Sequence, residues 1–411
     1  MLKRNFSFST ITTVSRLVSG FFLIFILARF LSVEDFGRFT YSLVFANILV
    51  LIVDYGYNLR LSTDISKNMN NISLLTWNSF RVKIFLTIFV FIILFTLKFL
   101  NFPRDNVFSV FLILTFSAMF NSIANHFLIP YRNIDKFEVE SKYAFLNNLI
   151  LLIFVLITLC ITNDILHVSS SFLLVKIVYS SLTIRKFLSD FGYESENINL
   201  ISELIEGIPY AIHIAVGAML LNIDTIILRE FVSDSEIGLY QAGMRALGAC
   251  TIGLGILNSV SIPKLSSLVN INRRELIALA TKLNFGSILI GLLISIFINV
   301  FSKELIDFVY GQKFEKLSDY VFCFSIIIFL RYFSIIYGVV LTISNQQKVR
   351  TYCVTIALLF IVISDFFVIP QYKLFGALYI LIFAHLIILI TYMLYAFRKY
   401  KTTFLNFSYD K

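Results

Sequence analysis

Long apolar runs, separated by short polar breaks, follow one another along nearly the whole chain. A helix needs roughly 20 mostly apolar residues to cross the hydrocarbon core of a bilayer, and these runs are of that kind. The pattern therefore predicts an all-α integral membrane protein with twelve transmembrane helices and no folded soluble domain. The predicted spans cover residues 8–31, 36–57, 80–100, 106–130, 143–162, 166–187, 203–228, 236–262, 277–301, 319–344, 350–369 and 374–397.

The composition supports a membrane location. The chain has 411 residues, of which 58% are hydrophobic and 14% charged, and it contains 45 Phe. These values lie far from the balance of a soluble globular domain. The cysteines all lie inside apolar stretches, without the spacing of a metal site or the polar context of a disulfide framework, so we interpret them as packing residues. They are Cys160, Cys250, Cys323 and Cys353.

The basic residues predict the orientation. Twelve spans place both termini on one side of the membrane, and that side carries more than twice as many of the 34 Lys and Arg residues as the other. Because cytoplasmic loops are enriched in Lys and Arg, both termini are predicted to be cytoplasmic. This distribution also accounts for most of the net charge of +9 without a bound ligand. The two longer polar connections, near residues 58–83 and 185–207, fall on the cytoplasmic side.

A short polar phrase occurs twice. The copies "EDFGRF" and "SEIGLY" follow the first and the seventh predicted span, about 200 positions apart, and each opens the next helix. An acidic residue in the first turn complements the helix dipole, and the glycine permits close helix packing. Equal positions in two six-span halves predict a duplicated transporter. Its lobes would be residues 1–190 and 191–411, related by a pseudo-two-fold axis along the membrane normal. The aligned residues are Asp35, Phe36, Gly37 and Phe39 with Glu236, Ile237, Gly238 and Tyr240.

Two stretches resemble a known family. "VSRLVSGFFLIFILARFLSVEDFGRFTYS" and "EGIPYAIHIAVGAMLLNIDTIILREFVSDSEIGLYQAGMR" are similar to the Wzx-type flippases of polysaccharide repeat units such as O-antigen. These flippases belong to a superfamily that also holds multidrug and toxin extruders and lipid II flippases. The telling features are the Gly-Ile-Pro opening, Asp224 near a helix end and the Gly-Leu-Tyr that follows.

The resemblance covers the twelve-span plan and implies a function. A protein of this kind moves an undecaprenyl-diphosphate-linked oligosaccharide from the inner to the outer leaflet of a bacterial cell membrane. Besides membrane lipid, the expected partners are a polysaccharide polymerase and a chain-length regulator of lipopolysaccharide or capsule assembly. No cofactor and no nucleic acid are expected.

Ionisable side chains inside the membrane are the candidate site residues. Each costs at least about 2.5 kcal/mol at mid-bilayer, so each needs a reason to be there. A cationic central cavity would suit a diphosphate, because guanidinium groups hold phosphate oxygens in bidentate fashion. The candidate substrate-binding residues are Arg16, Lys176, His213, Arg245 and Arg331.

Each candidate also has a structural interpretation. Arg16 and Arg245 lie close enough to span ends to snorkel to the interface. Arg331 could pair with an acid such as Asp365, and His213 could be a neutral hydrogen-bond donor between helices. Three acids could bind a coupling proton or sodium ion, or could serve as structural or interface residues. They are Asp54, Asp224 and Asp365.

Other functional classes fit less well. The sequence has no nucleotide-binding loop, no paired catalytic carboxylates and no nucleophile with its base, so an enzyme is not expected. A membrane polysaccharide polymerase or glycosyltransferase would be expected to carry a sizeable outer loop with catalytic polar residues, whereas the outer loops here are short. An ion-coupled drug extruder of the same superfamily would need an acidic cavity, whereas the buried excess here is basic.

Overall fold

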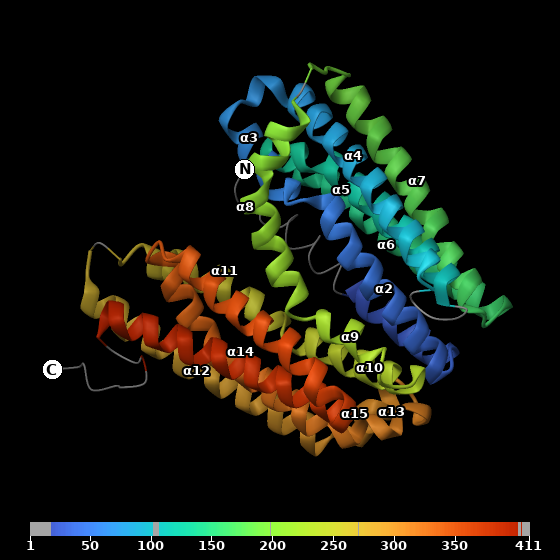
Figure 1. The fold of residues 1–411 in the computed structure, drawn as a ribbon. Helices are drawn as coiled ribbons and strands as arrows, with labels where there is room; N and C mark the ends of the chain where they lie inside the picture. Colours follow the sequence, from blue (N-terminus) through green and yellow to red (C-terminus); the bar gives the residue numbers. More distant parts are fainter. Residues whose placement is uncertain (1–17, 102–106, 198, 270, 402–403, 405–411) are drawn as a thin grey trace. The chain divides into compact units, whose positions relative to one another are not determined.

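The computed structural model describes residues 18–101, 107–197, 199–269, 271–401 and 404. All regular secondary structure in these residues is helical (Figure 1). The α-helices are α2 (Val33–Asp54), α3 (Tyr57–Lys67), α4 (Ile72–Phe99), α5 (Val107–Asn133), α6 (Phe137–Ile161), α7 (Ile165–Phe191), α8 (Leu200–Met219), α9 (Ile223–Leu228), α10 (Asp234–Cys250), α11 (Ile252–Ser266), α12 (Arg273–Val300), α13 (Ser302–Val309), α14 (Val321–Ile343) and α15 (Gln347–Tyr400). A shorter apolar helix covers Val18–Phe30, and the 3₁₀ segments are η1 (Met69–Asn71) and η2 (Gln312–Tyr320).

The membrane-spanning plan is confirmed in outline. Within the described residues, 10 helical segments are long and apolar enough to cross a membrane. The last two predicted spans are continuous in α15, where the non-helical backbone of Lys373 marks their junction. The seventh predicted span is divided into α8 and α9, and the eighth into α10 and α11. Only the part of the first predicted span from residue 18 onward lies in the described residues.

The chain forms two compact units, Met1–Ala218 and Met219–Lys411. We call them unit 1 and unit 2. Helix α8 lies almost entirely in unit 1, although it follows the lobe boundary predicted at residues 190 and 191. The predicted boundary divides the sequence into two six-span halves, which is a different criterion from compactness, and it stays a prediction.

Each unit is organised around one central helix. In unit 1, α5 packs against α7, α2, α3 and α4, and in unit 2, α14 packs against α12, α15, α11 and α10 (Figure 1). These central helices are the fourth predicted span of each half. Helices α4 and α6 expose most of their apolar side chains, which a lipid environment tolerates. The shared position of the central helix is what a repeated architecture predicts.

The repeated polar phrase opens a helix in both units, as predicted. Ser32 is the N-cap of α2 and accepts a hydrogen bond from the Asp35 backbone N–H at 3.0 Å. Ser233 is the N-cap of α10 and forms a reciprocal capping box with Glu236. Both serines satisfy a backbone donor that the helix itself cannot satisfy. The phrase therefore works as a helix-start signal in each copy.

The glycines of the eighth predicted span divide into two groups. A Cβ atom on Gly243 would lie 2.1 Å from the Phe324 ring, and one on Gly253 would lie 2.5 Å from the Tyr332 hydroxyl. Gly248 has no heavy atom within 4 Å of the corresponding position. Close packing therefore explains the first two glycines, whereas Gly248 lies in open space.

We expect Gly243→Ala to lower the thermal stability of the protein in detergent, because overpacking a buried contact costs about 1–3 kcal/mol. The matched control is Gly248→Ala in the same helix. It should leave stability unchanged or raise it, since replacing a helical glycine gains up to about 1 kcal/mol. Apparent melting temperatures of the purified variants test this, and equal effects at both positions would contradict the packing assignment.

Candidate functional site

Two arginines of unit 2 lie half-buried in membrane-spanning helices. Arg245 is on α10 and Arg331 is on α14. Neither guanidinium has a hydrogen-bond or ion-pair partner among the described residues, and Arg245 Nε is fully buried. The alternative pairing of Arg331 with Asp365 is not formed. A cation without a partner in a membrane protein is costly, so both groups are suited to an anionic ligand.

Among the described residues, no acidic side chain forms an ion pair with either arginine. Tyr310 acts electrostatically on Arg245, and its hydroxyl donates to the Ala242 carbonyl at 2.8 Å. Burial raises the pKa of Tyr310, so the phenol stays neutral. Arg331 acts electrostatically on His385, whose Nδ1 lies 2.9 Å from the Leu381 carbonyl. Neither Tyr310 nor His385 therefore supplies a negative charge to these arginines.

Lys176 has a different environment. It lies on α7 in unit 1 with 9% of its surface exposed, and its ammonium donates to Asn147 Oδ1 on α6 at 3.1 Å. The same ammonium lies 5.6 Å from the centroid of the Tyr179 ring. These contacts stabilise the charge inside the helix bundle. A substrate-binding role for Lys176 stays a prediction.

Two other predicted residues cannot be assigned contacts. Arg16 lies outside the described residues. His213 lies on α8, and the structure describes its backbone but not its side chain. Their predicted roles in substrate binding therefore stay predictions.

Two of the predicted ion-coupling acids come together in unit 2. Asp224 on α9 and Asp365 on α15 are both buried, and they act on each other electrostatically where α9 packs against α15. Asp224 accepts hydrogen bonds from the Tyr240 hydroxyl and the Thr225 backbone N–H. Neither carboxylate oxygen of Asp365 has a hydrogen-bond partner within the part of the chain that the structure describes. A pair of buried carboxyl groups, one of them unsatisfied, is a suitable site for a proton or a cation.

The third predicted acid is part of an ion pair. Asp54, the last residue of α2, binds the Lys83 ammonium of α4 at 2.8 Å and accepts from the Ser122 hydroxyl of α5 at 2.5 Å. Lys83 is 1% exposed and also donates to the Ser122 carbonyl. Asp54 thus joins three helices of unit 1. An ion-coupling role for it stays a prediction.

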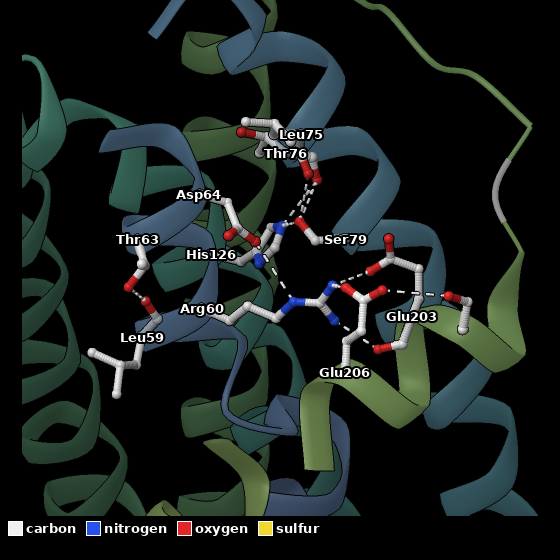
Figure 2. Close-up of polar contacts among 11 residues, drawn as sticks. Leu59, Arg60, Thr63, Asp64, Leu75, Thr76, Ser79, His126, Glu203 and Glu206 are labelled. Atoms are coloured by element: carbon white, nitrogen blue, oxygen red, sulfur yellow. Dashed lines mark hydrogen bonds and ion pairs between the residues drawn. The ribbon is translucent and has the colours of Figure 1, made fainter. Parts of the chain in front are cut away.

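Sequence reasoning missed Lys83 and His126. Lys83 lies at the start of a predicted span, where a lysine at the membrane boundary is unremarkable. His126 is fully buried in α5, with Nε2 3.1 Å from the Thr76 carbonyl and 3.3 Å from the Ser79 hydroxyl (Figure 2). Only the three-dimensional arrangement of α2, α4 and α5 reveals this polar cluster.

A second unpredicted cluster centres on Arg60 of α3. Its guanidinium binds the carboxylates of Glu203 at 2.9 Å and Glu206 at 2.8 Å, both on α8 (Figure 2). It also donates to the Glu203 carbonyl at 2.6 Å, and Asp64 of its own helix lies 3.6 Å away. From sequence alone, Arg60 is one of the basic residues of a predicted cytoplasmic connection. Its pairing with residues more than 140 positions later has no local sequence signal.

The helix order and the two units define a class of membrane transporter fold. Among solved structures, the chain is similar to an inward-facing multidrug resistance MATE family transporter of the MOP superfamily, with a TM-score of 0.73, 12% identity and coverage of 95% of each chain. It is also similar to the lipid II flippase MurJ in an inward closed conformation, with a TM-score of 0.73 and 16% identity over 97% of this chain and 89% of that chain.

The sequence comparison identifies the family. Residues 2–269 match the polysaccharide biosynthesis protein family, and the chain belongs to that family. It is 24% identical to the capsular polysaccharide biosynthesis protein CapF of Staphylococcus aureus over 410 residues, covering 96% of this chain and 99% of CapF. The resemblance inferred from the two sequence stretches is thereby confirmed.

We expect Asp54→Asn to destabilise unit 1 strongly, because it leaves the Lys83 charge buried without a counter-ion. Removing one partner of a buried ion pair lowers the free energy of unfolding by about 3–5 kcal/mol. Because Asp54 is partly exposed, we expect a loss of about 3 kcal/mol or less for Asp54→Asn. The double variant Asp54→Asn/Lys83→Met should recover part of the loss, since no unpaired charge remains. Apparent melting temperatures of the two single variants, Asp54→Asn and Lys83→Met, and of the double variant in detergent test this, and losses that simply add in the double variant would refute the pairing.

Proposed function

We propose that this protein is a flippase for undecaprenyl-diphosphate-linked oligosaccharide repeat units in a bacterial inner membrane. It moves them from the cytoplasmic to the outer leaflet by alternating access, and both of its termini are cytoplasmic. The single observation that carries the proposal is the pair of unpartnered arginines, Arg245 and Arg331, in membrane-spanning helices of unit 2. Membership of the polysaccharide biosynthesis protein family supports the substrate class.

The chemistry of the substrate fits these cations. A diphosphate brings at least two negative charges onto a path of low dielectric constant, where Coulomb interactions are strong. An arginine holds phosphate oxygens with a planar array of donors and stays charged throughout. The arginines, with Arg16, Lys176 and His213 as further candidates, would hold the diphosphate-sugar head while the prenyl tail stays in lipid.

The charge pattern favours this substrate over a cationic drug. An extruder of cations needs accessible negative charge, whereas the two least exposed carboxylates that the structure describes in unit 1, Glu140 and Asp54, are neutralised by Arg132 and Lys83. In unit 2 the unpartnered Arg245 and Arg331 would repel a cationic ligand, while the unpartnered acid Asp365 is assigned to the coupling ion.

Asp224 and Asp365 provide a site for the coupling ion. Asp365 is 0% exposed and has no hydrogen-bond partner on either oxygen, so binding a proton or Na⁺ would satisfy it. Both acids lie in the same unit as the two arginines. Binding a positive ion to these acids and an anionic head to the arginines would balance charge within unit 2.

The proposed function is tested by deleting the gene and determining the leaflet of the accumulated lipid-linked oligosaccharides. Spheroplasts are treated with a lectin or glycosidase that reaches only the outer leaflet. We expect complete repeat units to accumulate on the cytoplasmic side. Complete single units that reach the outer leaflet but remain unjoined would instead show that the protein is a polymerase.

We expect Arg331→Ala to reduce export of repeat units by about tenfold or more, since a hydrogen bond to a charged group contributes about 1.5–3 kcal/mol. Arg331→Lys should keep part of the activity, because the charge remains but bidentate binding is lost. The control is Arg398→Ala, which removes an exposed arginine at the end of α15. Export is measured at equal protein level in the membrane. Wild-type export by Arg331→Ala would rule out a role for this arginine in holding the head group.

We expect Asp365→Asn to uncouple transport from an ion gradient, because the amide keeps the shape of the carboxyl group but cannot take up a proton and offers Na⁺ no negative charge. The measurement is flipping in proteoliposomes with an imposed proton or Na⁺ gradient. The control is Asp319→Asn, which changes an exposed acid of the same unit. Full gradient dependence in Asp365→Asn would exclude this site as the coupling site.

A further inference from the structure

Helix α8 carries two distinct faces. Glu203, Glu206, Gly207 and Tyr210 recur at helical spacing and meet the bend between α2 and α3. The other face carries a row of exposed isoleucines. They are Ile201, Ile205, Ile208 and Ile212. The helix is therefore amphipathic, and its polar and small-residue face docks on α3 and the bend before it.

Arg60 is the centre of this docking contact. Its side chain is 8% exposed, and its guanidinium binds both Glu203 and Glu206 within 2.9 Å (Figure 2). It also lies 5.6 Å from the Tyr57 ring centroid. One buried cation thus joins α3 to successive turns of α8, with charge-assisted hydrogen bonds that are the stronger kind.

Close backbone approach completes the contact. A Cβ atom on Gly56 would lie 2.5 Å from the backbone of Tyr210, and one on Gly207 would lie 2.7 Å from the Tyr55 ring. Gly56 also has a φ of 73°, which favours glycine. Glycine is therefore present on both sides of the closest approach, Gly56 at the start of α3 and Gly207 in α8. The docking position of α8 is thus specific.

Within the described part of the chain, few other contacts hold α8 in place. Among the α8 residues whose side chains the structure describes, Gly207 alone is buried. Leu200 and Leu204 pack at the edge of a small cluster formed by Tyr57, Val82 and Leu86. A helix with little buried apolar surface has a low free-energy cost of local undocking. The Arg60 cluster thus provides most of the polar attachment.

We propose that the Arg60 cluster is a latch, which holds α8 on unit 1 in one state of the transport cycle and releases it in the other. This inference rests on the proposed function, since it assigns the latch to alternating access. Helix α8 is the segment through which the chain passes from unit 1 into unit 2. When its docked face is released, the segment that joins the two units along the chain is no longer held on α3.

The charges allow the latch to open. The carboxylate side chains on α8 are partly exposed, at 33% for Glu203 and 63% for Glu206. Water can therefore replace the Arg60 guanidinium as their hydrogen-bond partner when α8 moves away. Arg60 keeps Asp64, four residues along its own helix, and the Tyr57 ring as partners. Neither side is left with a buried, unpaired charge, which is the condition for a reversible ion-pair switch.

The first test measures docking without transport. Leu204→Cys is introduced into a background in which the native cysteines are replaced, and its reaction with a membrane-impermeant maleimide is timed. Glu203→Gln/Glu206→Gln should speed labelling by about tenfold, because the charge-assisted bonds are lost. The matched control is Glu194→Gln/Glu196→Gln, which removes two exposed acids of the preceding linker. Equal labelling rates in the two double variants would overturn the latch.

The second test locks the contact. Asp64→Cys and Glu203→Cys are bridged with a short bis-methanethiosulfonate, while Glu206 stays in place to pair with Arg60. Flipping of the lipid-linked oligosaccharide should stop in the bridged protein and return after reduction. Flipping at the unbridged rate would show that the contact is purely structural. The first test reports on docking even if the protein moves a different substrate, so failure of the latch and failure of the proposed function are distinguishable.

Discussion

The Lys83–Asp54 ion pair holds the end of α2 in place, and the other polar contacts between helices described in unit 1 depend on the position of that helix end. A buried lysine in a membrane protein requires a counter-ion, so Asp54, Lys83 and Ser122 hold α2, α4 and α5 together. The two residues that follow Asp54 have left-handed backbone conformations, with φ values of 42° and 73°. The chain bends there into α3, and this bend presents Arg60 to α8.

Unit 2 uses charge differently. The deep charges of unit 1 described above have partners, whereas Arg245, Arg331 and Asp365 have no polar partner among the described residues. Unpaired charges destabilise a protein unless a ligand or ion satisfies them. In the proposed mechanism an anionic head group and a coupling ion fill these roles. The ion pairs described in unit 1 thus stabilise the fold, whereas the unsatisfied groups in unit 2 are the ones that the proposed ligand and ion would stabilise.

The sequence predicted the features that depend on local pattern. Apolar length predicted the helices, and the two phrases around Asp35 and Glu236 marked helix starts that the N-cap serines confirm. Buried ionisable residues predicted Asp224 and Asp365 singly, but not that they lie together. Contacts between distant segments, such as Arg60 with Glu203, could not be predicted because each residue alone fits an ordinary polar connection. A charge near the end of a predicted span is the weakest signal of a buried ion pair, because a lysine such as Lys83 is ordinary at a membrane boundary.

The most direct test of the account is flipping by the purified protein. The full chain is reconstituted in liposomes that contain an undecaprenyl-diphosphate-linked oligosaccharide, and a lectin or glycosidase added outside measures the accessible fraction over time. We expect the protein to make the inner-leaflet pool accessible, whereas protein-free liposomes keep it protected. An inner pool that stays protected in the presence of folded protein under proton and Na⁺ gradients would contradict the assignment as a flippase.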